Sequence, residues 1–92
     1  MKIAWLKEAA EMLDRHYDYL RERNPAAAKR VFARILESTE RLHDFPQSGR
    51  TGAVAGTWEL IVPGLSYVII YRITPSRIEI LRVFHSSQNW RN

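Results

Sequence analysis

The sequence contains no cysteine, and this absence excludes several kinds of site. Without thiols there is no disulfide framework, no thiolate nucleophile and no cysteine-ligated zinc or iron–sulfur centre. The three histidines, His16, His43 and His85, fall in different segments, and none forms a helical metal-binding pair with a nearby acid. We therefore expect neither a metal nor a cofactor.

The sequence also lacks an apolar run of the roughly 20 residues that are needed to cross a bilayer. Its first 14 residues carry acidic side chains where a secretory signal would have its apolar core. Phosphate-binding glycine loops, the HExxH zinc motif and the GxSxG nucleophile motif are absent as well. We expect a cytoplasmic protein with no membrane partner.

What the sequence does contain is typical of one folded domain spanning residues 1–92, with 46% hydrophobic and 26% charged residues. The net charge of +4 arises mainly in the second half. There, residues 45–92 carry five arginines, no lysine and only two acidic side chains. The planar guanidinium group suits phosphates and carboxylates, so a nucleic acid and an acidic protein are both admissible partners.

The first half of the chain predicts two helices. Apolar residues recur at spacings of three and four from about residue 5 to 22, which places them on one helical stripe. Asn24 followed by Pro25 is typical of a helix start, so a second amphipathic helix begins after a short turn. A short turn makes the two helices antiparallel, and their shared apolar face then needs a partner.

The second half predicts strands at residues 58–62, 67–73 and 77–85, which are rich in β-branched and aromatic residues and are separated by proline-containing turns. Residues 2–5 are a further short strand candidate. The segment 67–73 is apolar on nearly both faces, which indicates a central strand. The expected fold is α+β with the order β-α-α-β-β-β, a helical hairpin packed on a small antiparallel sheet. We expect residues 49–56, with three glycines, to be a mobile connector.

Arg72, Arg82 and His85 are the residues most suited to chemistry. Arg72 and Arg82 lie on neighbouring strands, close enough to form an anion site, or alternatively to pair with Glu59 and Glu79. Arg82 and His85 are three residues apart, so they lie on opposite faces unless a bulge intervenes. His85 is either a strand-end histidine bonded to backbone or a general acid or base.

Trp58 and Trp90 are candidates for stacking on a base or filling a partner's pocket, and core packing is the alternative for each. Trp58 follows the glycine-containing connector, and Trp90 lies in a polar C-terminal segment. Trp5 is expected to pack in the core or at the start of the first helix.

Five motifs together resemble the RelE/ParE superfamily of toxins from type II toxin–antitoxin modules. They are residues 24–28 (NPAAA), 45–50 (FPQSGR), 56–64 (GTWELIVPG), 67–73 (YVIIYRI) and 80–85 (ILRVFH). The resemblance implies a β-α-α-β-β-β fold, a cognate antitoxin encoded beside the toxin, and a bacterial or archaeal cytoplasm.

The resemblance leaves two alternatives for the molecular target of the toxin. Ribosome-dependent members cut messenger RNA in the ribosomal A site; on that alternative, His85, Arg82 and Arg72 would be catalytic. ParE-type members inhibit DNA gyrase. The apolar Val68 and Ile69, the lack of lysine after residue 29 and the tryptophan in GTWEL depart from the ribonuclease pattern and favour the ParE-like alternative.

On the ParE-like alternative, the residues expected to recognise the target or the antitoxin are Arg50, Trp58, Tyr71, Arg72, Arg82 and Trp90. A third alternative is a weakly toxic domain that mainly binds its antitoxin and assists repression, touching operator DNA only indirectly through the antitoxin. The antitoxin is expected to bind as a helix or strand at a sheet edge or beside the helical hairpin, with its acidic residues meeting the arginines.

Overall fold

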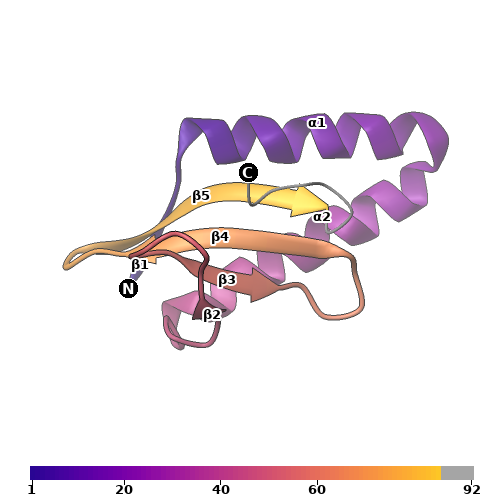
Figure 1. Cartoon of the computed structure of the whole chain (residues 1–92). Helices are drawn as coiled ribbons and strands as arrows, with labels where there is room; N and C mark the ends of the chain where they lie inside the picture. Colours follow the sequence, from indigo (N-terminus) through magenta and orange to yellow (C-terminus); the bar gives the residue numbers. More distant parts are fainter. Residues whose placement is uncertain (86–92) are drawn as a thin grey trace.

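The computed structural model describes residues 1–85 and forms two helices and a five-stranded sheet (Figure 1). The strand order is β1-β5-β4-β3-β2, which puts β4 in the middle as its two apolar faces predict. The elements are β1 (Lys2–Trp5), α1 (Lys7–Arg23), α2 (Pro25–Glu40), the 3-10 turn η1 (Arg41–His43), β2 (Arg50–Thr51), β3 (Trp58–Ile61), β4 (Tyr67–Ile73) and β5 (Arg77–His85).

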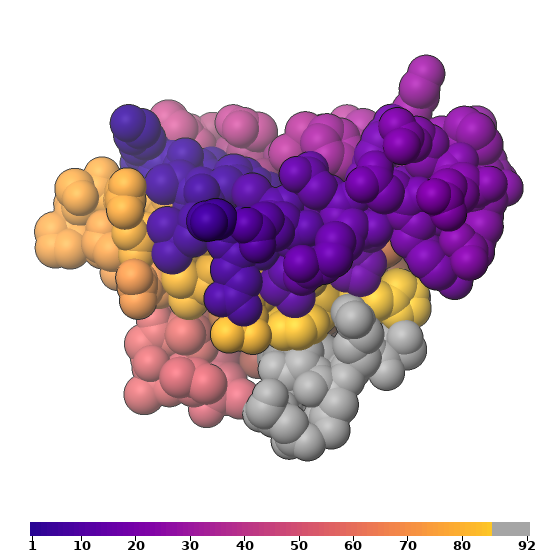
Figure 2. All heavy atoms as spheres, turned by 90° about the horizontal axis from the view of Figure 1, so that it is seen from above, coloured from indigo at the N-terminus to yellow at the C-terminus, as the bar shows by residue number. Residues whose placement is uncertain are grey.

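The predicted helical hairpin is confirmed. Asn24 ends α1 and caps α2, because its side-chain oxygen accepts a hydrogen bond from the Ala27 amide at 3.1 Å. The apolar stripes of both helices face the sheet, burying Leu13 of α1 and Ile35 of α2 in one core with the inward side chains of β4 and β5. Seen from above, α1 crosses the molecule, and part of β5 is visible beside it (Figure 2). Among residues 1–85, no helix has the length and apolarity needed to cross a membrane.

The α+β class is confirmed, but the sheet is mixed rather than wholly antiparallel. Strands β2 to β5 pair antiparallel, whereas β1 pairs parallel with β5, Lys2 opposite Arg77 and Trp5 opposite Ile80. The short-turn rule behind the antiparallel prediction does not apply to β1, because no hairpin joins it to its neighbour. Nearly the whole domain lies between β1 and β5 in the sequence.

Part of the expected connector is a strand. Arg50 and Thr51 form β2 opposite Glu59 and Trp58 of β3. Gly49 permits this close approach, because a Cβ there would lie 2.7 Å from both the Glu59 carbonyl oxygen and the Tyr71 hydroxyl. The connector is further held by Glu59, whose carboxylate accepts hydrogen bonds from Arg50 Nε and the Ala53 amide.

Candidate functional site

Two arginines and one glutamate form an ionic cluster on the face of the sheet away from the helices. Glu79 is 6% exposed and lies between Ile78 and Ile80, whose side chains point into the core. Its carboxylate accepts hydrogen bonds from Arg72 Nε at 2.5 Å and from Arg77 Nε at 2.9 Å. These two hydrogen bonds lower the pKa of Glu79, against the opposing effect of desolvation. The carboxylate therefore stays ionised and fixes the cross-strand pair of Arg72 and Glu79.

Arg82 does not pair with the acids that the sequence suggested, Glu59 and Glu79, but with an acid on α1. Its guanidinium lies 3.1 Å from a carboxylate oxygen of Glu8 on α1, and both side chains are at least half exposed. Glu59 instead receives Arg50, at 3.0 Å. Arg72 thus pairs with Glu79 as one sequence alternative proposed, whereas the ion pair of Arg82 within residues 1–85 is with Glu8.

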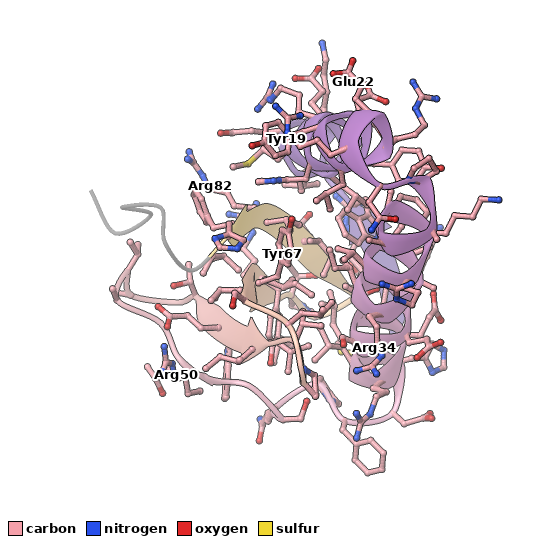
Figure 3. All side chains as sticks on the ribbon, turned by 90° about the vertical axis from the view of Figure 1, so that its right-hand side faces the viewer. Tyr19, Glu22, Arg34, Arg50, Tyr67 and Arg82 are labelled. Atoms are coloured by element: carbon pink, nitrogen blue, oxygen red, sulfur yellow. The ribbon has the colours of Figure 1, made fainter. Side chains whose placement is uncertain are left out.

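A β-bulge sets which way the end of β5 faces. Ile70 pairs with Arg82 and Tyr71 pairs with Ile80, so Leu81 is an extra residue between them. Beyond the bulge the register is regular to His85, which places Arg82 and His85 on opposite faces of the strand. In Figure 3, Arg82 points out of the molecule while Tyr67, the pairing partner of His85, lies inside it.

His85 belongs instead to an aromatic cluster under α1. The Tyr67 ring packs nearly perpendicular to two imidazole rings, with its centroid 5.3 Å from that of His16 and 5.3 Å from that of His85. These residues line a cavity of about 730 Å³ together with Arg15 and the β3–β4 turn. Burial lowers the pKa of His16, and the nearby positive charges of His85 and Arg15 lower it further. Burial also raises the pKa of Tyr67.

Sequence reasoning missed His16 and Tyr67 as members of this cluster. His16 lies three residues after Leu13 of the apolar stripe, so its spacing was a usable signal for an inward-facing histidine. The contact of Tyr67 with His85 depends on the strand register, which the bulge sets. The spacing of residues along the chain does not predict the contact between Tyr67 and His85.

This cluster predicts acid lability. Because the pKa of His16 is lower in the folded than in the unfolded chain, the unfolded chain takes up a proton first as the pH falls below about 6.5. The free energy of unfolding is then highest above that pH and decreases toward the folded pKa. We expect His16→Gln to flatten this decrease in urea unfolding measured from pH 7.5 to 5. Equal slopes for wild type and His16→Gln would contradict the assignment.

The remaining predicted recognition residues differ in exposure. Trp58 is half-buried and stacks on Tyr71, with ring centroids 6.3 Å apart. Tyr71 itself is 0% exposed, so its side chain supports Trp58 and the adjacent loop rather than presenting a surface. Arg50 and Arg72 each keep about half of their side chains exposed. Trp90 lies outside the described residues.

The chain matches the family model described as ParE toxin of type II toxin-antitoxin system, parDE, over residues 3–90. It is 39% identical over 89 residues to "Putative toxin Y4kP" of Sinorhizobium fredii, covering 97% of this chain and 92% of that protein. It is 26% identical over 87 residues to "Toxin RelE2" of Caulobacter vibrioides, covering 95% of this chain and 97% of that protein. A solved structure titled "Chromosomal ParDE TA system from P. aeruginosa" matches with a TM-score of 0.83 at 26% identity, covering 92% of this chain and 95% of that one.

The family match spans nearly the whole chain, and the solved structure shares its arrangement of helices and strands. The resemblance carried by the five motifs is thereby confirmed. A cognate antitoxin is implied as the partner. The chain belongs to the ParE family of toxins from type II toxin–antitoxin systems.

Proposed function

We propose that this toxin acts in the cytoplasm by binding and inhibiting DNA gyrase, and that direct binding of its antitoxin neutralises it. The observation that carries the proposal is the separation of Arg82 from His85 across the two faces of β5. Ribonucleolytic activity through these residues would need an acid or base and its phosphate-binding arginines around one scissile bond.

The contacts of Arg72, Arg82 and His85 support the same proposal. Arg72 is bonded to Glu79, Arg82 is paired with Glu8, and His85 packs against Tyr67. Each of these side chains is thus held in a different place. Arg72 and Arg82 nevertheless leave about half of their surface exposed, as residues that recognise a protein must.

The recognition surface that we propose combines half-exposed basic and aromatic side chains of β2 to β5 with Trp90, which lies outside the described residues. Arginine and tryptophan are enriched among residues that dominate protein–protein binding energy. Tyr71 has a supporting part, because it is buried beneath Trp58. The proposed contact residues are Arg50, Trp58, Arg72, Arg82 and Trp90.

The direct test uses purified toxin, purified gyrase and a relaxed plasmid. We expect the toxin to inhibit supercoiling, stoichiometric antitoxin to restore it, and translation of a reporter message in a cell-free system to continue. Uninhibited gyrase together with cleavage of ribosome-bound message would contradict the proposal. His85→Ala would then show whether this histidine is the acid or base of the ribonuclease alternative.

A further inference from the structure

The cavity of about 730 Å³ under α1 contains a tyrosine hydroxyl that forms no hydrogen bond within residues 1–85. Tyr67 is 6% exposed, and its ring contacts are with His16 and His85. Every fully buried side-chain polar atom of the described residues does have a hydrogen-bond partner. The Tyr67 hydroxyl must therefore open onto the cavity that Tyr67 lines, where it can donate to a bound molecule.

The ionisable side chains that line this cavity favour an anion. Arg15 and His16 of α1 line it together with His85 of β5, and no acidic side chain is found among its described lining residues. Arg15 is exposed and forms no ion pair within residues 1–85, so its guanidinium is available to bind an anion.

The imidazole of His16 also has unused hydrogen-bonding capacity. It is half-buried and forms no hydrogen bond within the part of the chain that the structure describes. Burial lowers its pKa and so favours the neutral ring in the free toxin. A bound anion has the opposite effect, because negative charge stabilises the imidazolium. Both ring N–H groups are then donors.

The other walls of the cavity are apolar and leave space for an organic group. They come from α1, α2 and the β3–β4 turn, and their apolar side chains are half-buried. These side chains are Met12, Leu20, Val31 and Leu65. Sites for small molecules are typically cavities of about 300–1,000 Å³ with apolar walls and a few polar groups. The cavity therefore fits a molecule that carries an anionic group on an apolar body.

A phosphate monoester fits the donors of this cavity better than a carboxylate does. Arg15 and His16 are consecutive in α1, so their side chains leave the helix about 100° apart, and Tyr67 comes from β4. Three donors that come from different directions suit the three terminal oxygens of a phosphate. A carboxylate has only two oxygens, which lie in one plane.

We propose that this cavity binds a small phosphate monoester, with its phosphate at Arg15, His16 and Tyr67 and its organic group against the apolar walls. The site lies on the side of the sheet that faces the helices, whereas the cluster of Arg72 and Glu79 lies on the other side. It is therefore separate from the proposed recognition surface, and the proposal is independent of gyrase as the target.

The first test is calorimetry on the full-length toxin with three probes. We expect phenyl phosphate to bind one saturable site with a Kd of about 1 mM or tighter. Inorganic phosphate lacks the apolar body and benzoate lacks the third oxygen, so each should bind at least about fivefold more weakly. Phenyl phosphate that fails to saturate the toxin by about 10 mM would overturn the proposal. Equal affinity for benzoate, or for inorganic phosphate, would contradict the phosphate or the apolar part of the site.

The second test removes one donor at a time. Tyr67→Phe should fold normally, because the hydroxyl forms no hydrogen bond within residues 1–85. We expect Tyr67→Phe and Arg15→Gln each to bind phenyl phosphate about tenfold more weakly or worse, since hydrogen bonds to a charged group are lost. Circular dichroism checks the fold of each variant. Wild-type affinity in either folded variant would overturn the assignment of that donor.

Two matched variants on α1 change the same residue types outside the cavity. Tyr17 packs on Phe32, and the Arg21 guanidinium lies 3.5 Å from a carboxylate oxygen of Asp18. Tyr17→Phe and Arg21→Gln should keep the affinity for phenyl phosphate within about twofold. If Arg21→Gln loses as much affinity as Arg15→Gln, the probe binds the positive surface in general and the proposed site is wrong.

The third test observes His16 itself by NMR, with the signal assigned from His16→Gln. Its described surroundings are Arg15 of α1, Tyr67 of β4, His85 of β5 and the apolar Val31 of α2. We expect saturating phenyl phosphate to raise the pKa of His16. An unchanged pKa at saturation would place the probe elsewhere and overturn the proposal. No gyrase is present in these measurements, so their failure and the failure of gyrase inhibition are distinguishable.

Discussion

Replacing Tyr71 with phenylalanine is expected to lower the free energy of unfolding by about 2 kcal/mol. The hydroxyl donates to the Pro46 carbonyl at 2.8 Å and accepts from the Gly49 amide at 3.0 Å. Phenylalanine fills the same core position but leaves both backbone groups without this partner. For a domain of this size, the loss corresponds to a decrease in Tm of about 8–16 °C.

The matched control is Tyr19→Phe. Tyr19 is 57% exposed, and the contact of its ring with the Arg23 guanidinium does not use the hydroxyl. Its removal should change stability by less than about 0.5 kcal/mol. Urea unfolding of both variants measures the difference. A Tyr71→Phe variant as stable as Tyr19→Phe would show that the hydroxyl does not anchor the loop.

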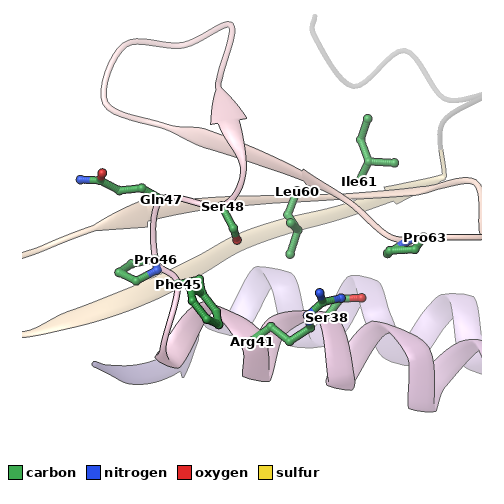
Figure 4. A pocket seen from close by; sticks show the side chains of 9 residues that line it. All are labelled: Ser38, Arg41, Phe45, Pro46, Gln47, Ser48, Leu60, Ile61 and Pro63. Atoms are coloured by element: carbon green, nitrogen blue, oxygen red, sulfur yellow. The ribbon is translucent and has the colours of Figure 1, made fainter.

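The same substitution affects the groove between β3 and the end of α2, which Leu60 and Phe45 line (Figure 4). Residues 46–49 are held by the Tyr71 hydroxyl, and Pro46, Gln47 and Ser48 line the groove. Loss of the hydroxyl should therefore accelerate exchange of the Gly49 amide. Tyr71 thus positions both this loop and the Trp58 ring.

Truncating Arg82 should have the largest effect on toxicity. We expect Arg82→Ala to need at least about tenfold more protein for half-maximal inhibition of gyrase, because buried interface arginines often contribute more than about 2 kcal/mol. The fold should persist, since the half-exposed pair with Glu8 contributes about 1 kcal/mol or less. Supercoiling titrations and thermal unfolding measure the two quantities separately.

Two variants separate recognition from structure. Glu8→Ala removes the ion pair but keeps the arginine, so it should inhibit gyrase normally. Arg21→Ala removes another exposed arginine that pairs with an acid, Asp18, and it should also be fully active. A folded Arg82→Ala protein of wild-type potency would remove Arg82 from the recognition surface. If Glu8→Ala loses as much inhibitory potency as Arg82→Ala, the effect belongs to the ion pair and not to recognition by Arg82.

Local patterns in the sequence predicted the helices and the central strand. The stripe through Leu13, the Asn24–Pro25 helix start and the two apolar faces of residues 67–73 each report a local property, namely periodicity, capping or burial. The structure confirms all three. The motif resemblance gave the family, and the family model confirms it.

Features set by long-range register were not predictable in the same way. The parallel pairing of β1 depends on how strands far apart in the sequence align, and the bulge at Leu81 shifts the register within the β4–β5 hairpin. The pairing of Arg82 with Glu8 and the contacts of His16 and His85 with Tyr67 follow from that alignment. Charge pattern alone identified the arginines, but it did not identify which acid each would meet.

Pulse labelling in cells tests most directly the proposal that this toxin acts on gyrase. The toxin is induced without antitoxin, and incorporation of labelled thymidine and methionine is compared in the first minutes. If gyrase is the target, we expect an early loss of thymidine incorporation while methionine incorporation continues. An early loss of methionine incorporation with DNA synthesis intact would contradict it.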